Sequence, residues 1–402
     1  MRYTDVAIVG GGLAGATAAA MLGRAGVTAC LIDPHVTYPP ELRCEKLAGN
    51  QLELLRKTGL AEQTLDATTL DGEVWEARFG LVVARKPSDQ HGVMYDTLVN
   101  AVRAQVPASV EIIHGKAYAI VTSSDRQRIT LADDKVVSAR LVVLANGLNI
   151  GLREMLGMQR RVISSCHSIT LGFNIAPVGR ASFEFPALTY WPGRPGQRMA
   201  YLSVFPIGDK MRANLMVYRD MTDPWLRDFR QAPEATMMAV MPGLHRMMGD
   251  FKVGTPIRIR PADLCVTDGY LRPGVVLAGD AFSTSCPAAG TGTTKVFTDV
   301  ERLCNVHIPA WLATDGMDVD KIKQFYEDPI KVACEARCLA KAYHLRSLSI
   351  ERGVAWRAGR WGRFAVRLAQ GVRYAIRKRL PVRSARPERR VIGGQPQRGR
   401  LA

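Results

Sequence analysis

Several signatures of common protein classes are missing from this sequence of 402 residues. Its eight cysteines form no C-x-x-C pair, and its seven histidines show no H-x-x-x-H or H-E-x-x-H spacing, so we expect no metal site. Scattered single cysteines favour a reducing compartment over a disulfide framework. A secretory signal begins with a basic stretch, continues with an apolar run and ends in small residues at a cleavage site. The first residues do not show this order, which predicts a cytoplasmic protein.

Long uncharged runs are also scarce. Residues 6–23 form one run of 18 residues without charge, near the lower limit for a membrane-spanning helix. The run contains five glycines, however, which fits a buried strand, a turn and a helix better than a membrane span.

Acidic residues are nearly absent from the end of the chain. Residues 341–402 contain 17 Lys and Arg against only Glu351 and Glu388, which accounts for +15 of the net charge of +17. The first 340 residues carry 37 basic and 35 acidic side chains and are electrostatically ordinary. Nucleic-acid binding is therefore not expected of the main body, whose length and 47% hydrophobic content suit two or three globular domains.

The first motif present is a glycine-rich turn at residues 10–15, which follows an apolar strand at 5–9 and precedes an alanine-rich helix. Gly10 is predicted to make the tight turn, Gly12 to let the backbone approach a pyrophosphate, and Gly15 to let the helix pack closely. The pyrophosphate would lie at the helix start, by Leu13 and Ala14, where free N–H groups favour an anion. The alternative is a tight turn with a structural role only.

A second strand, at residues 28–32, ends at Asp33 and completes a βαβ unit of about thirty residues. The Asp33 carboxylate is placed to accept hydrogen bonds from a ribose diol. An acid at this position disfavours a 2′-phosphate, so the first motif suits FAD or NAD rather than NADP.

The late part of the chain favours FAD over NAD. A buried strand at 274–278 is followed by an acid, a loop with proline and glycine, and a helix to about residue 303. Asp280 can accept hydrogen bonds from a polyol such as ribityl, and the helix start can stabilise negative charge on a reduced flavin ring. The alternative is a simple strand-loop-helix connection at the surface. The motif residues are Gly279, Asp280, Pro287, Gly290, Gly292 and Thr293.

Together, over about residues 1–305, these motifs resemble the FAD-dependent aromatic hydroxylase superfamily, the single-component flavin monooxygenases similar to para-hydroxybenzoate hydroxylase. The resemblance implies an α/β fold with a Rossmann-like FAD-binding domain (three-layer ββα), an inserted antiparallel-sheet substrate domain and a basic C-terminal helical tail. The expected boundaries are 1–165 and 256–340 for the two FAD-binding parts, 166–255 for the substrate sheet and 341–402 for the tail.

The same resemblance assigns roles to individual residues. Asp280 would contact the ribityl chain, and the loop after it would line the isoalloxazine. Arg43 resembles the family's arginine near the ribityl and pyrophosphate groups of FAD; a solvated surface arginine is the alternative. No catalytic residue is assigned.

The middle motif departs from the family pattern. Where relatives have Asp-Gly, Ser and Arg, this chain has Asn146-Gly147, Ile150 and Arg153. That motif helps bind flavin and nicotinamide in relatives, and no second complete G-x-G-x-x-G is present. NAD(P)H is therefore expected as a transient co-substrate that docks in a groove.

The segment 166–255 has strand-like runs at 168–175, 199–206 and 212–219 separated by turns, which predicts an antiparallel sheet. In the family this sheet covers the flavin ring and binds substrate. Tyr190, Trp191, Tyr201 and Phe205 could line an apolar pocket, but such aromatics are as often core residues, so none is assigned to substrate.

The tail combines an apolar stripe with arginines. From 354 to 380, apolar residues including Trp361, Phe364, Leu368, Val372 and Ile376 recur at helical spacing, with Arg and Lys outside the stripe. This pattern is typical of an interfacial membrane helix, and equally of a helix packed on the protein with a solvated arginine face; nucleic-acid binding is the weaker alternative. Residues 383–402 are predicted to be disordered.

The predicted function is an FAD-dependent monooxygenase that hydroxylates or epoxidises an apolar or aromatic small molecule with O2 and NAD(P)H, through a flavin hydroperoxide. One alternative is an FAD-dependent reductase of isoprenoid double bonds, similar to geranylgeranyl reductases. Another is a flavin-binding protein docked on a membrane with little catalysis. The tail would place the cytoplasmic protein on the anionic inner face of a membrane.

Overall fold

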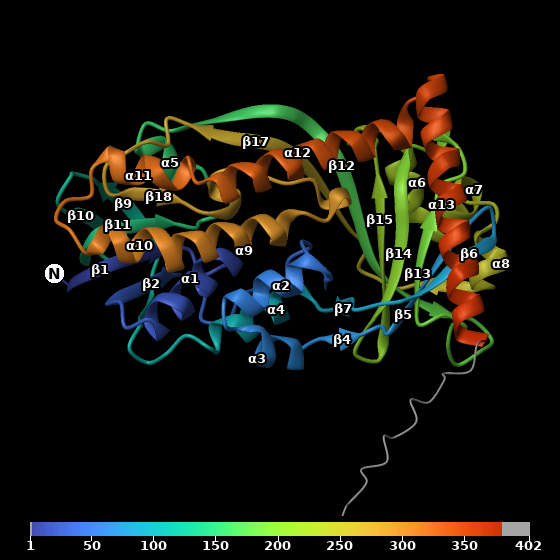
Figure 1. Ribbon diagram of the computed structural model, residues 1–402, viewed down its shortest axis with the longest axis horizontal. Helices are drawn as coiled ribbons and strands as arrows, with labels where there is room; N and C mark the ends of the chain where they lie inside the picture. The colour runs from blue at the N-terminus through green and yellow to red at the C-terminus, as the bar shows by residue number, and fades with distance from the viewer. Residues whose placement is uncertain (1, 380–402) are drawn as a thin grey trace, which may run out of the picture.

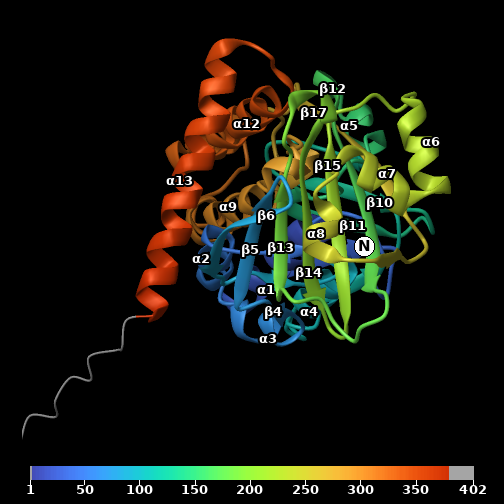
Figure 2. The same ribbon diagram turned by 90° about the vertical axis from the view of Figure 1, so that its right-hand side faces the viewer.

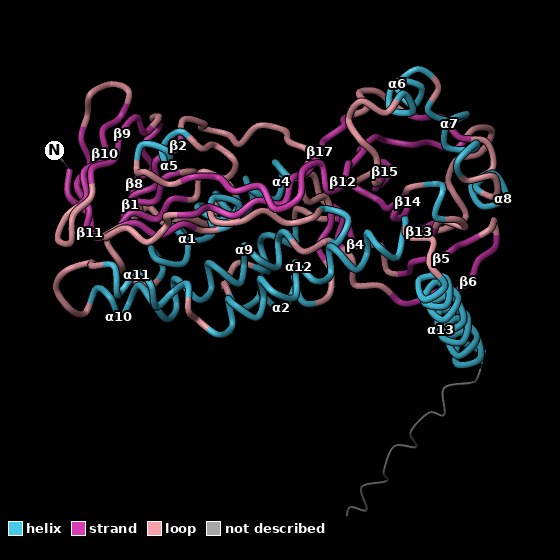
Figure 3. Tube along the Cα trace, turned by 90° about the horizontal axis from the view of Figure 1, so that it is seen from above, coloured by secondary structure: helices cyan, strands magenta, loops and turns pink. Residues whose placement is uncertain are grey.

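The computed structural model describes residues 2–379, so the segment predicted to be disordered, 383–402, lies outside the described residues (Figure 1). The chain forms an elongated molecule with one sheet in each half. The long helix α12 (Pro329–Ile350) runs from one half to the other, and α13 (Val354–Arg379) stands at the far end (Figures 1 and 3).

The first sheet contains the glycine-rich motif. Its strands follow the order β8-β2-β1-β11-β10-β9, with β18 beside β11. They are β1 (Arg2–Val9), β2 (Ala29–Asp33), β8 (Glu111–His114), β9 (Ala117–Val121), β10 (Gln127–Leu131), β11 (Val136–Leu144) and β18 (Val275–Leu277). The pairs β10–β11 and β10–β9 are antiparallel, and all other pairs of neighbouring strands in this sheet are parallel. The central strands are buried along most of their length because both faces of the sheet are covered.

Helices cover one face of this sheet, and the strands β9 and β10 at its end pack over the other face. Val6 and Ile8 share a core with α1 (Leu13–Arg24), α9 (Gly292–Arg302), α10 (Ile308–Leu312) and α11 (Val319–Tyr326). Ala7 and Val9 point the opposite way, into a core with β9, β10 and α5 (Gly151–Met155). Helices α2 (Asn50–Lys57), α3 (Ala61–Asp66) and α4 (Tyr95–Arg103) pack outside α1 and α9. This arrangement confirms the predicted Rossmann-like α/β class.

The second sheet fills the other half. Its order is β16-β12-β15-β14-β13-β5-β6, with β17 beside β12. The strands are β5 (Glu73–Arg78), β6 (Leu81–Pro87), β12 (Gln159–Pro177), β13 (Ala187–Trp191), β14 (Met199–Ile207), β15 (Lys210–Val217), β16 (Phe251–Val253) and β17 (Arg258–Asp268). The sheet thus draws strands from 73–87 and from 258–268 as well as from the segment 166–255.

The two faces of the second sheet differ because side chains alternate along each strand. Ile169, Leu171 and Phe173 pack against α6 (Pro224–Gln231), α7 (Pro233–Val240) and α8 (Leu244–Met248). Thr170 belongs to the opposite face, which looks toward the first sheet. A short sheet of β3 (Lys46–Leu47), β7 (His91–Gly92) and β4 (Thr69–Leu70) lies at the junction of the two halves.

No helix within residues 2–379 combines the length and the apolar character that crossing a membrane requires. The uncharged run at 6–23 forms β1, a turn and α1, as the sequence indicated.

Candidate flavin and substrate site

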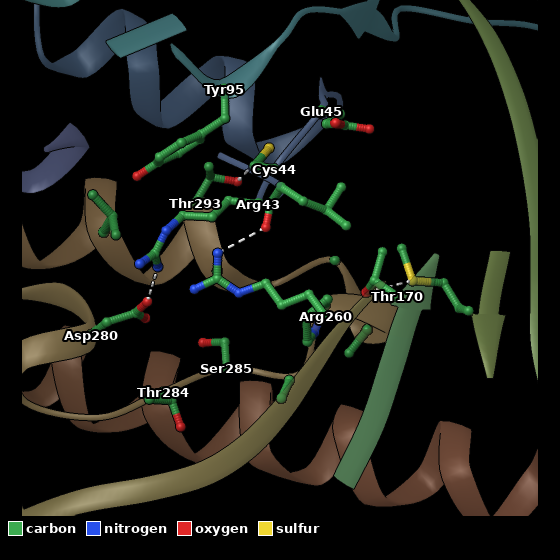
Figure 4. A pocket seen from close by; sticks show the side chains of 18 of the residues that line it. Arg43, Cys44, Glu45, Tyr95, Thr170, Arg260, Asp280, Thr284, Ser285 and Thr293 are labelled. Atoms are coloured by element: carbon green, nitrogen blue, oxygen red, sulfur yellow. Dashed lines mark hydrogen bonds and ion pairs between the residues drawn. The ribbon is translucent and has the colours of Figure 1, made fainter. Parts of the chain in front are cut away.

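A cavity of about 440 Å³ lies where the two halves meet (Figure 4). Its walls come from the segment after β2, from the loop that precedes α9 and from β12, β14, β15 and β17. This volume lies in the usual range for small-molecule sites. Both halves are therefore needed to form the site.

The start of α1 lies at one end of this region and is built by glycines. Gly10 has φ +106°, and a Cβ on Gly15 would lie 1.8 Å from the Gly10 carbonyl oxygen, so the helix approaches the turn as closely as backbone allows. A Cβ on Gly12 would meet nothing nearer than Tyr38, at 3.7 Å. No side chain caps this helix, so its first N–H groups are free for an anion such as a pyrophosphate.

Asp33 lies at the end of β2, as predicted, and its carboxylate is buried. One oxygen accepts a hydrogen bond from the Gly11 N–H at 2.6 Å, and the other accepts one from the His35 N–H at 2.9 Å. Arg103 lies 3.6 Å away from the second oxygen. Asp33 therefore fixes the shape of the glycine-rich turn, in addition to any contact with a ribose.

Arg43 and Asp280 meet across the cavity, although 237 positions separate them in sequence (Figure 4). The Arg43 Nη1 donates to Asp280 Oδ2 at 2.6 Å, and its Nε donates to Glu41 Oε2 at 2.7 Å. Burial opposes ionisation of Glu41, but hydrogen bonds from Arg43 and Tyr38 outweigh it and lower the pKa of Glu41 to about 2. Arg43 is thus a partly buried, ion-paired residue, which rules out a solvated surface arginine.

The loop between Asp280 and α9 forms a further wall. Helix α9 begins without a side-chain cap, so its first N–H groups lie free beside the cavity. Gln51 holds this turn in place, because its Nε2 donates to the Gly290 carbonyl at 3.0 Å and to Thr293 Oγ1 at 2.6 Å. The arrangement places the positive end of the α9 dipole at the site.

A buried ionic network anchors this loop from behind. Asp299 accepts a hydrogen bond from the Gly279 N–H at 2.9 Å and pairs with the Lys331 ammonium at 2.8 Å. Lys295 pairs with Glu335 at 2.9 Å and also donates to the Ser283 carbonyl at 2.9 Å. Because Asp280 directly follows Gly279, the network fixes the backbone that carries the Asp280 carboxylate.

The second sheet supplies the opposite wall. Thr170 of β12, Tyr201 of β14, and Asn214 and Met216 of β15 line the cavity. The Tyr201 hydroxyl donates to the Ala288 carbonyl at 2.9 Å, which ties the sheet to the loop before α9. This wall is mixed, with apolar rings and thioether beside a few polar groups.

Two neighbouring residues of the junction segment, Glu45 and Lys46, also line the cavity. Glu45 is buried and accepts two hydrogen bonds from Arg212, both at 2.8 Å, and one from Asn214 at 2.7 Å. The Lys46 ammonium donates to Ser203 Oγ at 2.7 Å. Burial lowers the pKa of Lys46 to about 8, although the charge of Asp71 acts in the other direction.

The predicted residues divide into two groups. Those that line the cavity are Leu13, Arg43, Asp280, Pro287, Gly290, Gly292 and Thr293. Those that are absent from its lining are Gly10, Gly12, Ala14, Gly15, Asp33 and Gly279. The second group shapes the turns at α1 and β18 instead.

Sequence reasoning missed the residues that reach the cavity from the junction and from the second sheet. They are Glu45, Lys46, Gln51, Tyr95, Thr170, Asn214 and Met216, and Glu41 was missed as the residue that pairs with Arg43. Two of them, Thr170 and Asn214, could have been found from the alternation of polar and apolar residues in 168–175 and 212–219. This alternation places both residues on the face of the strand opposite to the apolar one.

The altered middle motif is structural here. Arg153 is buried and donates to Thr267 Oγ1 at 2.9 Å and to the carbonyls of Gly147 and Asn149 at 3.1 and 3.0 Å. Asn146 also donates to the Asn149 carbonyl, at 3.0 Å. Neither Asn146 nor Arg153 lines the cavity. Arg153 therefore ties the loop after β11 to β17.

These features fit an FAD. The open space in front of Gly12 and the uncapped start of α1 suit the pyrophosphate. Arg43 and Asp280 offer a cation and an acceptor for the phosphates and the ribityl chain, and the start of α9 suits a flavin ring that gains negative charge.

Comparison with known proteins leads to the same cofactor. The sequence matches the family described as FAD binding domain over residues 3–306. The 3-demethoxyubiquinol 3-hydroxylase of Escherichia coli (strain K12) is 25% identical over 332 residues, which cover 76% of this chain and 80% of the relative. Squalene monooxygenase of Rattus norvegicus is 24% identical over 324 residues, which cover 74% of this chain and 53% of the relative.

Solved structures share the fold. The p-nitrophenol 4-monooxygenase PnpA from Pseudomonas putida DLL-E4 superposes with a TM-score of 0.69 at 17% identity, covering 94% of this chain and 98% of that one. The flavin-dependent brominase Bmp2 gives 0.65 at 16% identity, with 94% and 100% covered. Because the family match spans most of the sequence, this chain belongs to the FAD binding domain family, within the FAD-dependent aromatic hydroxylase superfamily, and is an FAD-dependent monooxygenase.

Proposed function

We propose that this enzyme inserts one atom of O2 into an apolar or aromatic small molecule, by hydroxylation or epoxidation, with NAD(P)H as the reductant. One observation supports the proposal: residues proposed to bind the flavin, among them Arg43 and Asp280, line a cavity whose volume suits a small molecule. A monooxygenase needs this arrangement because the reacting atom of the substrate must lie against the flavin.

FAD, when bound, supplies the redox and oxygen chemistry. The chain's own residues bind and orient. Arg43 and Asp280 would hold the ribityl and phosphate groups, and the start of α9 would stabilise negative charge on the ring. The second sheet would exclude water from the cavity, which would strengthen these electrostatic contacts.

Lys46 is the residue we propose to bind the polar group of the substrate. Lys46 lines the cavity, and its ammonium donates a hydrogen bond to Ser203 Oγ at 2.7 Å. Below a pH of about 8 it is a cation that can donate a hydrogen bond to a hydroxyl or an oxyanion. Met216 and Tyr201 would contact the apolar part of the same molecule.

The nicotinamide cofactor is proposed to dock transiently at the rim of the cavity. Arg160, Arg260 and Lys341 line the cavity and are the cations proposed to attract this cofactor. Arg260 is positioned by hydrogen bonds to Glu41 at 3.2 Å and to the Leu42 carbonyl at 2.9 Å. Phosphates are the groups of NAD(P)H that such a rim attracts.

The test follows the flavin spectrum after the dithionite-reduced holoprotein is mixed with O2. We expect a transient absorbing species between the reduced and oxidised spectra. A direct return to the oxidised spectrum, together with anaerobic reduction of geranylgeranyl double bonds, would replace the proposal with the reductase. Firmly bound FAD without NAD(P)H- or dithionite-dependent turnover would instead indicate a flavin-binding protein with little catalysis.

A further inference from the structure

Helix α13 lies against the second sheet through one face only. The residues of this face are not exposed and follow one another at helical spacing; they are Trp356, Arg360, Phe364, Arg367, Gly371 and Tyr374. A Cβ on Gly371 would lie 2.5 Å from the Val83 carbonyl oxygen, so the helix touches the backbone of β6 there. The helix therefore packs against β6, beside which it stands in Figure 2.

Charged and aromatic contacts fix this docked face. Arg367 pairs with Glu76 at 3.0 Å and lies over the Trp191 ring, 3.6 Å from its centroid. Arg78 of β5 lies over the Phe364 ring of this face, 5.4 Å from its centroid, and 5.6 Å from the centroid of Trp361, which lies beside the docked face. The apolar stripe predicted from the sequence is thus not the surface that holds the helix, and of that stripe only Phe364 belongs to the docked face.

The rest of the stripe faces outward. Its large side chains are between 45% and 54% exposed, and Val354, 79% exposed, extends the same side of the helix beyond the predicted stripe; the large side chains are Trp361, Leu368, Val372 and Ile376. At 100° per residue they fall within about 80° of the helix circumference, and the docked face lies about 120° away. Trp361 also stacks on Phe79, which is itself 42% exposed, so the apolar surface continues onto the turn between β5 and β6.

Positive charge accompanies this surface. Arg357, Arg363 and Arg373 are exposed on the same helix, and no acidic residue occurs between 352 and 387. The segment that follows the described residues, 380–402, adds six arginines and one glutamate. An apolar stripe of large side chains beside arginines suits the boundary between lipid headgroups and acyl chains.

We propose that this exposed stripe of α13 binds the surface of an anionic lipid bilayer. The charge argues against a second copy of the chain as the occupant, because two such helices would bring like charges together. Because α13 already packs on the second sheet, lipid binding would not have to order the helix, which lowers the entropic cost of association. The proposal does not depend on the reaction that the flavin carries out.

The experiment compares two Val→Asp variants of full-length holoprotein. Val372→Asp changes the stripe, and Val366→Asp changes an equally exposed valine about 120° around the helix, at 57% exposure against 52%. Binding is measured by sedimentation with vesicles of phosphatidylcholine and phosphatidylglycerol in equal parts, and with phosphatidylcholine alone. Flavin absorbance and Tm confirm that both variants fold.

We expect wild type and Val366→Asp to sediment with the anionic vesicles. Val372→Asp should bind at least about tenfold more weakly, because it loses apolar burial and adds a charge that the surface repels. Binding to the uncharged vesicles should also be weaker by about tenfold or more. Failure of wild type to bind, or equal binding by both variants, would overturn the proposal. A wild-type dimer that Val372→Asp converts to a monomer, without any lipid binding, would assign the stripe to a second copy instead.

Discussion

The two walls of the cavity are built differently. The side proposed to bind FAD, which we call the flavin wall, depends on backbone: the uncapped starts of α1 and α9 and, behind its lining, the turn at Gly10 and its contact with Gly15. The side proposed to bind substrate, which we call the substrate wall, depends on side chains that the strands of the second sheet and the junction segment bring together, such as Lys46, Thr170 and Asn214. A backbone site requires particular glycines in a short segment, whereas a side-chain site accepts many residue types at scattered positions.

The largest effect should come from replacing Gly15 with valine. Its Cβ would lie 1.8 Å from the Gly10 carbonyl oxygen, which leaves no room for α1 beside the turn. We expect Gly15→Val to yield little folded protein, measured by circular dichroism and by recovery in the monomeric fraction. Normal recovery and an unchanged Tm would mean that the backbone at this wall can shift.

The next effect concerns a contact within the substrate wall, between the junction segment and β15. Glu45→Ala leaves the buried Arg212 guanidinium without its carboxylate, so we expect a loss of about 3–5 kcal/mol in the free energy of unfolding. Glu62→Ala, at an exposed position of α3, is the control and should change stability by less than about 0.5 kcal/mol. Urea denaturation measures both. If the two variants lose similar amounts of unfolding free energy, the stability of the protein does not depend on the pair of Glu45 and Arg212.

Gly12→Val should separate binding from folding. A Cβ here meets no protein atom closer than 3.7 Å, so the apoprotein should keep its Tm. The larger side chain occupies the approach of the pyrophosphate, and we expect FAD to bind about 100-fold more weakly, a cost of about 2.7 kcal/mol. Flavin absorbance after purification and titration with FAD measure this. Retention of stoichiometric flavin would contradict the proposal that the pyrophosphate approaches the backbone at Gly12.

These variants show which parts of the site the sequence could predict. The positions of Gly12, Gly15 and Asp280 could be read because each lies in a short strand-turn-helix segment whose local geometry dictates the residue. Glu45 could not be read, because the residue that makes it important, Arg212, lies 167 positions away. Such a pairing exists only once the sheets are assembled.

The fold shows the same limit. The strands of the first sheet and the antiparallel character of 166–255 follow from local patterns, and the structure contains both. The recruitment of β5 and β6 into the second sheet depends on pairing between Glu73–Arg78 and Ala187–Trp191, which no local pattern encodes. For α13, periodicity predicted the apolar stripe, but the close approach of Gly371 to β6 decided which face is docked.

The smallest expected effect tests whether water is excluded from the substrate wall around Lys46. Burial lowers the pKa of Lys46 to about 8, so between pH 8 and its unfolded value the unfolded chain binds more protons and stability rises with pH. The Lys46→Met variant has no ammonium at this position, so it lacks this pH-dependent contribution to stability. We expect the wild type to gain about 1 kcal/mol relative to the variant between pH 8 and 9, measured by urea denaturation. A constant difference across this range would indicate that water reaches the Lys46 ammonium.

The placement of the two flavin motifs has a consequence for synthesis on the ribosome. One motif lies in the first 33 residues, and its counterpart begins at Gly279 and continues into α9, which ends at Arg302. The last strand of the second sheet, β17, ends at Asp268, before that counterpart. Because chains emerge from their N-terminus, every strand of the sheet that covers the cavity is made before the cofactor site is complete. We therefore expect FAD to bind late in synthesis, and not to a nascent chain that stops short of α9.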